Sequence, residues 1–85
     1  MTDEYTVKVF PNPSATEFSI QVNSNSNEPV TVSIMDGSGR VMQTKITTIL
    51  KSAFVTVGAD LIGGTYFARV SQGKNVQVVK LVKLN

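Results

Sequence analysis

Apolar and polar side chains alternate along most of the chain, in short runs separated by clusters of glycine, proline, asparagine and serine. A period of two residues is typical of β-strands with one buried face, and no run has the 3.6-residue period of an amphipathic helix. The pattern predicts about seven strands, over residues 5–10, 16–23, 30–36, 40–50 and 53–57, from residue 66 onward, and over 75–84. The segment over 40–50 is either one long strand or two strands with a bend. Such short, one-sided strands are not stable alone, so we expect two antiparallel sheets packed face to face, with an open meander as the alternative.

The parity of the apolar positions predicts which side chains are buried. Those sharing one face of the second and third predicted strands are Phe18, Ile20, Val22, Val30, Val32 and Ile34. Parity fails between residues 40 and 50, where apolar side chains fall on both faces, and a bulge would reconcile them. It fails again at 78–79 and 81–82, which predicts a last strand that either is covered on both faces or carries a bulge.

Two glycine-containing segments predict specific turns. The sequence "DGSG" at 36–39 suits a tight hairpin, because glycine adopts positive φ without a steric penalty. In "LIGGTYFARV" at 61–70, Leu61 can close the end of a sandwich, the two glycines allow a sharp bend, and Tyr66 begins the next strand. A tyrosine at such a corner is typical of immunoglobulin-like sandwiches, where its hydroxyl bonds to nearby backbone. The predicted fold is therefore an all-β, immunoglobulin-like or fibronectin type III-like antiparallel sandwich, with a core around Phe18, Ile34 and Tyr66.

Composition excludes most compact catalytic designs. The 85 residues contain no cysteine and no histidine, which excludes disulfides, Cys/His metal sites, thiol nucleophiles and Ser-His pairs. The acidic residues that could form a carboxylate pair all fall at predicted strand ends or turns, where solvation explains them: Glu17, Glu28, Asp36 and Asp60. We therefore expect a protein that is not an enzyme and that needs no cofactor.

Charge is distributed unevenly along the chain. Residues 1–43 carry five acidic and two basic side chains, whereas residues 44–85 carry one acidic and six basic ones. Nucleic acid is not the expected partner of this basic half, because no Arg-rich helix or RNA-binding aromatic motif accompanies the charge. No apolar run approaches the ~20 residues that span a bilayer, so we do not expect a membrane-spanning protein.

The aromatic side chains leave one alternative function open. Exposed rings on a flat sheet could stack on sugars, as in carbohydrate-binding modules. Phe67 has the opposite parity to Tyr66 and is therefore expected to face outward or toward an edge, where Arg69 and Lys80 could share its surface.

Four segments, taken together and in order, resemble a known family. They are "VFPNPS" at 9–14, "DGSGRVM" at 36–42, "LIGGTYFARV" at 61–70 and "GKNVQVVKLVK" at 73–83. The chain is similar to the type A C-terminal sorting domain of cargo proteins exported by the type IX (Por) secretion system of Bacteroidetes-type bacteria. The motif positions that carry the resemblance are Pro11, Asn12, Pro13, Gly39, Arg40, Gly64 and Tyr66, together with the last-strand residues Lys80, Leu81, Val82 and Lys83.

This resemblance implies a secretion signal rather than a catalyst. Residues 5–85 would be a single sorting domain behind a larger passenger, and residues 1–4 a linker or added start. The domain would meet the translocon at the outer membrane, a sortase-like peptidase would cleave it off, and the passenger would pass from the periplasm to the cell surface or medium.

Physical reasons divide the motif positions into two groups. The prolines, the glycines and Tyr66 have sufficient structural roles as turn and corner residues. Lys80 and Lys83 have no evident packing role, so the strand over 80–83 is the candidate for recognition by the translocon. The remaining alternatives are a carbohydrate-binding or adhesive module appended to an extracellular enzyme, and a structural spacer of the fibronectin type III kind.

Overall fold

The computed structural model describes residues 5–47 and 52–84. These residues form seven strands and, within the described ranges, no helix: β1 (Tyr5–Phe10), β2 (Phe18–Ser24), β3 (Val30–Met35), β4 (Val41–Thr47), β5 (Ser52–Val57), β6 (Gly64–Gln72) and β7 (Asn75–Lys83). The predicted strand over 40–50 is thus described only to residue 47, and the predicted linker over 1–4 lies outside the described residues.

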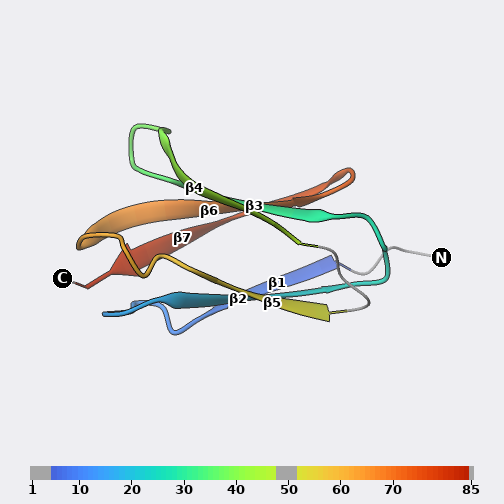
Figure 1. Cartoon of the computed structure of the whole chain (residues 1–85), viewed down its shortest axis with the longest axis horizontal. Coiled ribbons are helices and arrows are strands. Elements are labelled where there is room, and N and C mark those ends of the chain that lie inside the picture. Colours follow the sequence, from blue (N-terminus) through green and yellow to red (C-terminus); the bar gives the residue numbers. More distant parts are fainter. Residues whose placement is uncertain (1–4, 48–51, 85) are drawn as a thin grey trace.

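The strands form two stacked layers (Figure 1). One sheet has the order β1-β2-β5 and the other the order β4-β3-β6-β7, and all strand pairs are antiparallel. The chain leaves the first sheet after β2, returns to it for β5, and leaves it again for β6, so an open meander is excluded. The predicted all-β, immunoglobulin-like sandwich is confirmed.

The core lies between the two sheets and follows the predicted parity. All six positions predicted from β2 and β3 are buried, as are Tyr66, Ala68 and Val70 on β6 and Leu81 on β7. β2 buries every second residue along its whole length because it is the central strand of its sheet, with one face on the core and the other toward solvent. The core predicted around Phe18, Ile34 and Tyr66 is therefore confirmed.

The predicted tyrosine corner is present. The Tyr66 hydroxyl donates a hydrogen bond of 2.8 Å to the carbonyl of Ile62, and Leu61 packs against the core from the same turn. β6 begins at Gly64, two residues earlier than predicted.

A bulge is expected between residues 40 and 50 and is one alternative for the last strand, and the structure has it in β4 but not in β7. Ile34 pairs with Gln43 and Met35 with Val41, so Met42 is an extra residue in β4 and the predicted bulge is confirmed. In β7 the pairing with β6 is continuous from Gly64–Lys83 to Gln72–Asn75. The alternative of a bulge in the last strand is wrong, and the strand is buried on its core face at Leu81 and Lys83 while its outer face is exposed or half-buried.

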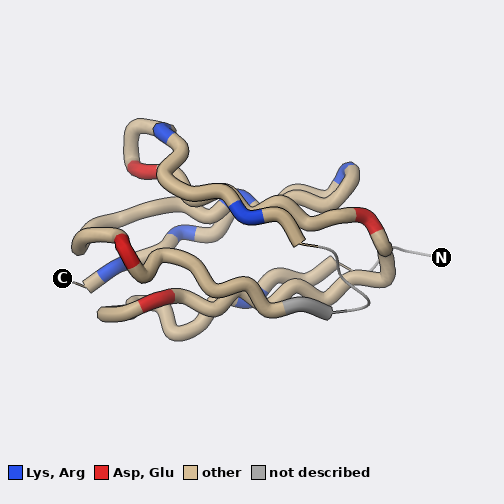
Figure 2. The backbone as a smooth tube through the Cα atoms, in the orientation of Figure 1, with Lys and Arg blue, Asp and Glu red and all other residues tan. Residues whose placement is uncertain are grey.

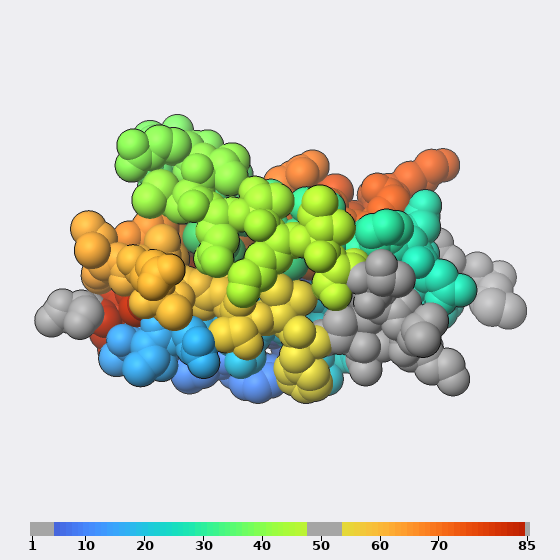
Figure 3. All heavy atoms as spheres, viewed as in Figure 1, coloured from blue at the N-terminus to red at the C-terminus, as the bar shows by residue number. Residues whose placement is uncertain are grey.

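Polar side chains join the two sheets along both open sides of the sandwich. On one side the Tyr5 hydroxyl donates to the Val70 carbonyl at 2.7 Å, and burial raises the pKa of this tyrosine. On the other side, Lys45 donates to the carbonyl of Thr56 and Gln43 accepts from the backbone N–H of Gly58. Atoms of β4 accordingly lie against atoms of β5 and the following turn (Figure 3).

A buried amide secures the end of β6. The Gln72 side chain accepts from the Ser24 hydroxyl and donates to the carbonyls of Ser26 and Glu28, at 3.1 and 2.8 Å. Buried amides are costly unless they are hydrogen-bonded. In the described residues, every buried side-chain nitrogen and oxygen has a partner.

The corner bond predicts a measurable cost for Tyr66→Phe. Removing the hydroxyl leaves the Ile62 carbonyl without its donor, so the free energy of unfolding should fall by about 1 kcal/mol in urea denaturation. Phe54→Leu is the matched control: its ring is 63% exposed, and its effect should stay within about 0.5 kcal/mol. Equal stability of the parent and the Tyr66 variant would contradict the role of the corner.

Candidate functional site

The last strand presents its candidate recognition residues on two different faces. β7 is an edge strand, and side chains along a strand alternate in direction. Lys80 is exposed and Val82 half-buried on the outer side, whereas Leu81 and Lys83 are buried on the core side. The four residues over 80–83 therefore do not form one surface, and only Lys80 and Val82 face outward.

The expectation that Lys83 has no packing role is wrong. Its side chain is only 5% exposed, and its ammonium group donates to the carbonyl of Gly58 at 2.6 Å and to that of Ala59 at 3.4 Å. Gly58, at the turn that follows β5, belongs to the opposite layer, so Lys83 joins the end of β7 to the other sheet. Parity was the signal that could have revealed this, because a residue two positions after the buried Leu81 must also point inward.

The Pro-Asn-Pro segment lies against the free edge of β7. The Asn12 amide donates to the carbonyl of Lys80 at 2.8 Å, and its oxygen accepts from the backbone N–H of Val82 at 3.0 Å. This side chain thus satisfies two groups that an edge strand leaves unpaired. Both peptide bonds that precede the prolines, 10–11 and 12–13, are cis.

Backbone bonds continue this cover toward the end of the strand. The Ser14 N–H donates to the carbonyl of Val82 at 3.0 Å, and the Leu84 N–H donates to the carbonyl of Ser14 at 2.8 Å. Ser14 is buried and pairs in parallel with Lys83, while its hydroxyl donates to the carbonyl of Glu17. The edge of β7 is therefore covered by the Asn12 side chain and by a single backbone bridge at Ser14.

The hairpin motif is stabilised by one carboxylate. The Asp36 side chain accepts hydrogen bonds from the hydroxyl and the N–H of Ser38, and from the N–H and the Nε of Arg40. These bonds, chiefly that from the Ser38 hydroxyl, lower the pKa of Asp36 below its ordinary value. Gly39 has a φ of 89°, which a tight turn of this kind requires, so the predicted hairpin is confirmed.

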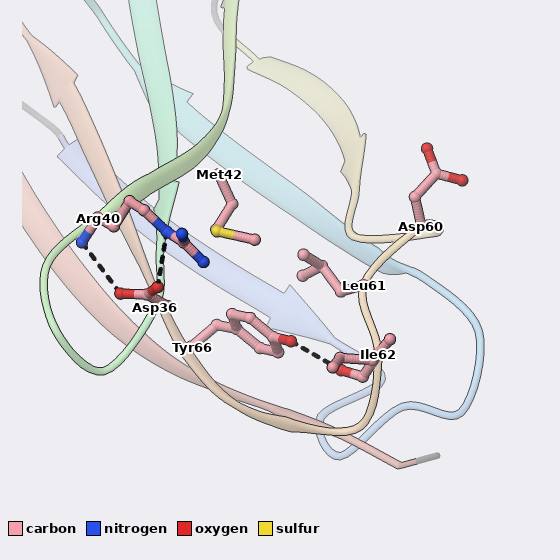
Figure 4. Close-up of a pocket in the computed structure, with 7 residues that line it drawn as sticks. All are labelled: Asp36, Arg40, Met42, Asp60, Leu61, Ile62 and Tyr66. Atoms are coloured by element: carbon pink, nitrogen blue, oxygen red, sulfur yellow. Dashed lines mark hydrogen bonds and ion pairs between the residues drawn. The ribbon is translucent and has the colours of Figure 1, made fainter.

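A pocket of about 380 Å³ lies between this hairpin and the tyrosine corner (Figure 4). Its lining residues are Asp36, Arg40, Met42, Asp60, Leu61, Ile62 and Tyr66. The walls are mostly apolar, with the charged groups of the hairpin on one side and Asp60 on the other.

Parts of all four motif segments lie at one end of the sandwich. The 12–14 segment and the end of β7 are joined by hydrogen bonds, Lys83 joins β7 to the turn at 58–59, and the pocket separates that corner from the hairpin. Figure 1 shows the C-terminus at this same end. Segments up to 70 residues apart in sequence thus form one continuous structure.

Comparison with known proteins assigns this arrangement to a family. The model of a family described as the secretion system C-terminal sorting domain matches residues 8–84. The chain belongs to this family. The resemblance to the type IX sorting domain is thereby confirmed. No curated protein sequence matches this chain.

Two of the acidic residues considered as a carboxylate pair, Asp36 and Asp60, line the same pocket from different sides. Glu17, Glu28, Asp36 and Asp60 all lie outside the strands. Figure 2 shows the acidic positions along the backbone in red. In the described ranges they form no group of three that could hold a metal ion. Strands and turns make up these ranges, which contain no helix with the length and hydropathy of a membrane span.

The cover of the β7 edge predicts a local effect of Asn12→Ala. Losing both bonds exposes the Val82 amide to water, so its hydrogen exchange should accelerate by about tenfold, with a loss of about 1–2 kcal/mol in the free energy of unfolding. Asn25→Ala, in the exposed loop after β2, is the matched control and should leave Val82 unchanged. Unaltered exchange in the Asn12 variant would mean that the segment does not protect the edge.

The two lysines of β7 are predicted to differ in stability effects. Lys83→Ala leaves the Gly58 carbonyl without its charged donor and opens a space in the sandwich, so it should cost about 2 kcal/mol in the free energy of unfolding. Lys80→Ala, at an exposed position, should cost less than about 0.5 kcal/mol. Guanidinium denaturation of both variants measures this, and equal costs would contradict the distinct roles.

Proposed function

We propose that this sorting domain directs a larger passenger across the outer membrane through the type IX secretion system and is then cleaved off. The observation that carries the proposal is the family match over residues 8–84, which includes all four motif segments. The partners would be the type IX translocon, a sortase-like peptidase that cuts upstream of the domain, and the passenger. The domain would pass through the periplasm, and the passenger would reach the cell surface or the medium.

The translocon recognises the signal as a folded domain and not as an extended peptide. For the translocon to contact Leu81 or Lys83 directly, the end of β7 would have to separate from the core, from Asn12 and from the turn at Gly58. Lys80 and Val82, by contrast, face outward from the folded sheet. Of the four candidate residues in the last strand, these two are accessible for recognition, whereas Leu81 and Lys83 keep the strand in place.

One observation favours a second candidate function, a carbohydrate-binding or adhesive module. Phe10 and Phe54 are 45% and 63% exposed on the outer side of the three-stranded sheet, with ring centroids 6.2 Å apart. Their planes meet at 81°, so a flat sugar ring cannot stack on both at once. The secretion signal is therefore the better-supported function. Retention of the domain on insoluble glycans, lost in Phe54→Ala, would favour the alternative.

A fusion experiment tests the secretion signal. A neutral reporter carrying residues 1–85 at its C-terminus should appear outside a type IX-competent cell, in a form shortened by removal of the domain. The same fusion in a strain without the translocon is the control and should stay in the periplasm. A reporter that remains periplasmic in the competent strain refutes the proposal.

A further inference from the structure

The outer face of the four-stranded sheet carries a second ordered surface. In an antiparallel pair, directly opposite residues point to the same side of the sheet. The register of β4-β3-β6-β7 therefore places one set of side chains together on this outer face: Val41, Thr44, Ile46, Thr31, Ser33, Met35, Thr65, Phe67, Arg69, Ser71, Val76, Val78, Lys80 and Val82.

This outer face is unusually apolar for a surface without cover in the described structure. Sheets with one solvated face normally alternate apolar-in and polar-out, yet half of the fourteen positions carry large apolar side chains. Val41 is 56%, Val76 49% and Val78 54% exposed. The exposed apolar side chains lie on the two edge strands, β4 and β7, and the half-buried Met35 and Phe67 lie between them on β3 and β6. Apolar side chains grouped on one exposed face favour an interaction site.

The charge on the outer face has one sign. Arg69 pairs with Val78 and Lys80 with Phe67, so both cations lie among the apolar side chains. Within the described strands they are the only ionisable residues that point to this side. The acidic residues of the described ranges lie in turns and at element ends, and Figure 2 shows their positions along the backbone in red. The prediction that Phe67 faces outward and shares its surface with Arg69 and Lys80 is thus confirmed. The same surface continues across β3 and β4.

We propose that this outer face docks onto a folded protein of the secretion machinery whose apolar patch is bordered by carboxylates, an inference that rests on the proposed function. Across an interface, carboxylates on the partner would complement Arg69 and Lys80. A second copy of the chain fits poorly, because a two-fold interface would place Arg69 and Lys80 against the same charges. A lipid surface also fits poorly, because hydroxyls such as Thr31, Ser33 and Ser71 lose their hydrogen bonds in hydrocarbon.

The size of the outer face fits a reversible contact. Four strands spaced by about 4.8 Å, over seven residues of about 3.3 Å each, present roughly 400 Å². A standard protein interface buries about 800 Å² on each partner. A contact of half that size is transient, as a signal that must be released after export requires.

The test compares export of the reporter fusion between two variants and two matched controls. Arg69→Glu/Lys80→Glu reverses the charge of the outer face, and Val76→Thr/Val78→Thr removes apolar surface while keeping β-branched side chains. The controls, Lys8→Glu and Phe54→Thr, make comparable changes on the outer side of the other sheet. Each purified chain is melted to show that its midpoint lies within about 3 °C of the parent.

Export should fall by more than about tenfold in both outer-face variants and stay within about twofold of the parent in both controls. Normal export of correctly folded outer-face variants overturns this inference while leaving the secretion signal intact. A parent fusion that is not exported at all refutes the proposed function instead. An equal loss in the controls also overturns the inference, because the effect would then not belong to this face.

Two further measurements test whether the outer face binds a membrane or a second copy of the chain. Sedimentation of the parent chain with vesicles of phosphatidylethanolamine and phosphatidylglycerol, abolished by Arg69→Glu/Lys80→Glu, would replace the protein partner with a membrane. A parent dimer in analytical ultracentrifugation that becomes monomeric in Val76→Thr/Val78→Thr would replace it with a second copy. A monomer that does not sediment with vesicles supports the protein partner.

Discussion

The last strand lies at the edge of its sheet, and the fold depends on how that edge is closed. An open edge leaves backbone donors and acceptors unpaired and invites association with other chains. Here Asn12 and Ser14 supply partners for residues 80–84, and Lys83 bonds to carbonyls of the opposite layer. The final strand is therefore held by the first loop and by the corner after β5, so the end of the chain is secured by its beginning and middle.

This closure gives the motif of the sorting domain a physical meaning. Turn and corner residues, which look independent in the sequence, converge on one end of the sandwich and fix the direction of β7. With Leu81 and Lys83 held inside, Lys80 and Val82 are displayed on a rigid sheet together with the side chains of β6. Buried and outward-facing side chains thus alternate along a single strand, as the two-residue period of a strand requires.

The two-residue periodicity predicted the structural features that the local sequence determines. It missed the hydrogen bonds between segments that are distant in the sequence. The buried faces of β2 and β3 and the Tyr66 corner follow from alternation and from turn chemistry within a few residues. The bonds of Asn12 link residues about 70 positions apart and leave no local signal. Lys83 departs from the expectation because its position along the strand, two residues after Leu81, turns it inward despite its charge.

The central claim, that the signal is read while its strands stay paired, can be tested by locking the fold. Gln21 and Phe54 lie directly opposite each other on β2 and β5, away from β7. A reporter fusion carrying Gln21→Cys/Phe54→Cys, oxidised in the periplasm, should be exported as efficiently as its reduced form. Retention of the oxidised fusion, with export restored by reductant, would show that the domain must unfold to be read and would contradict this account.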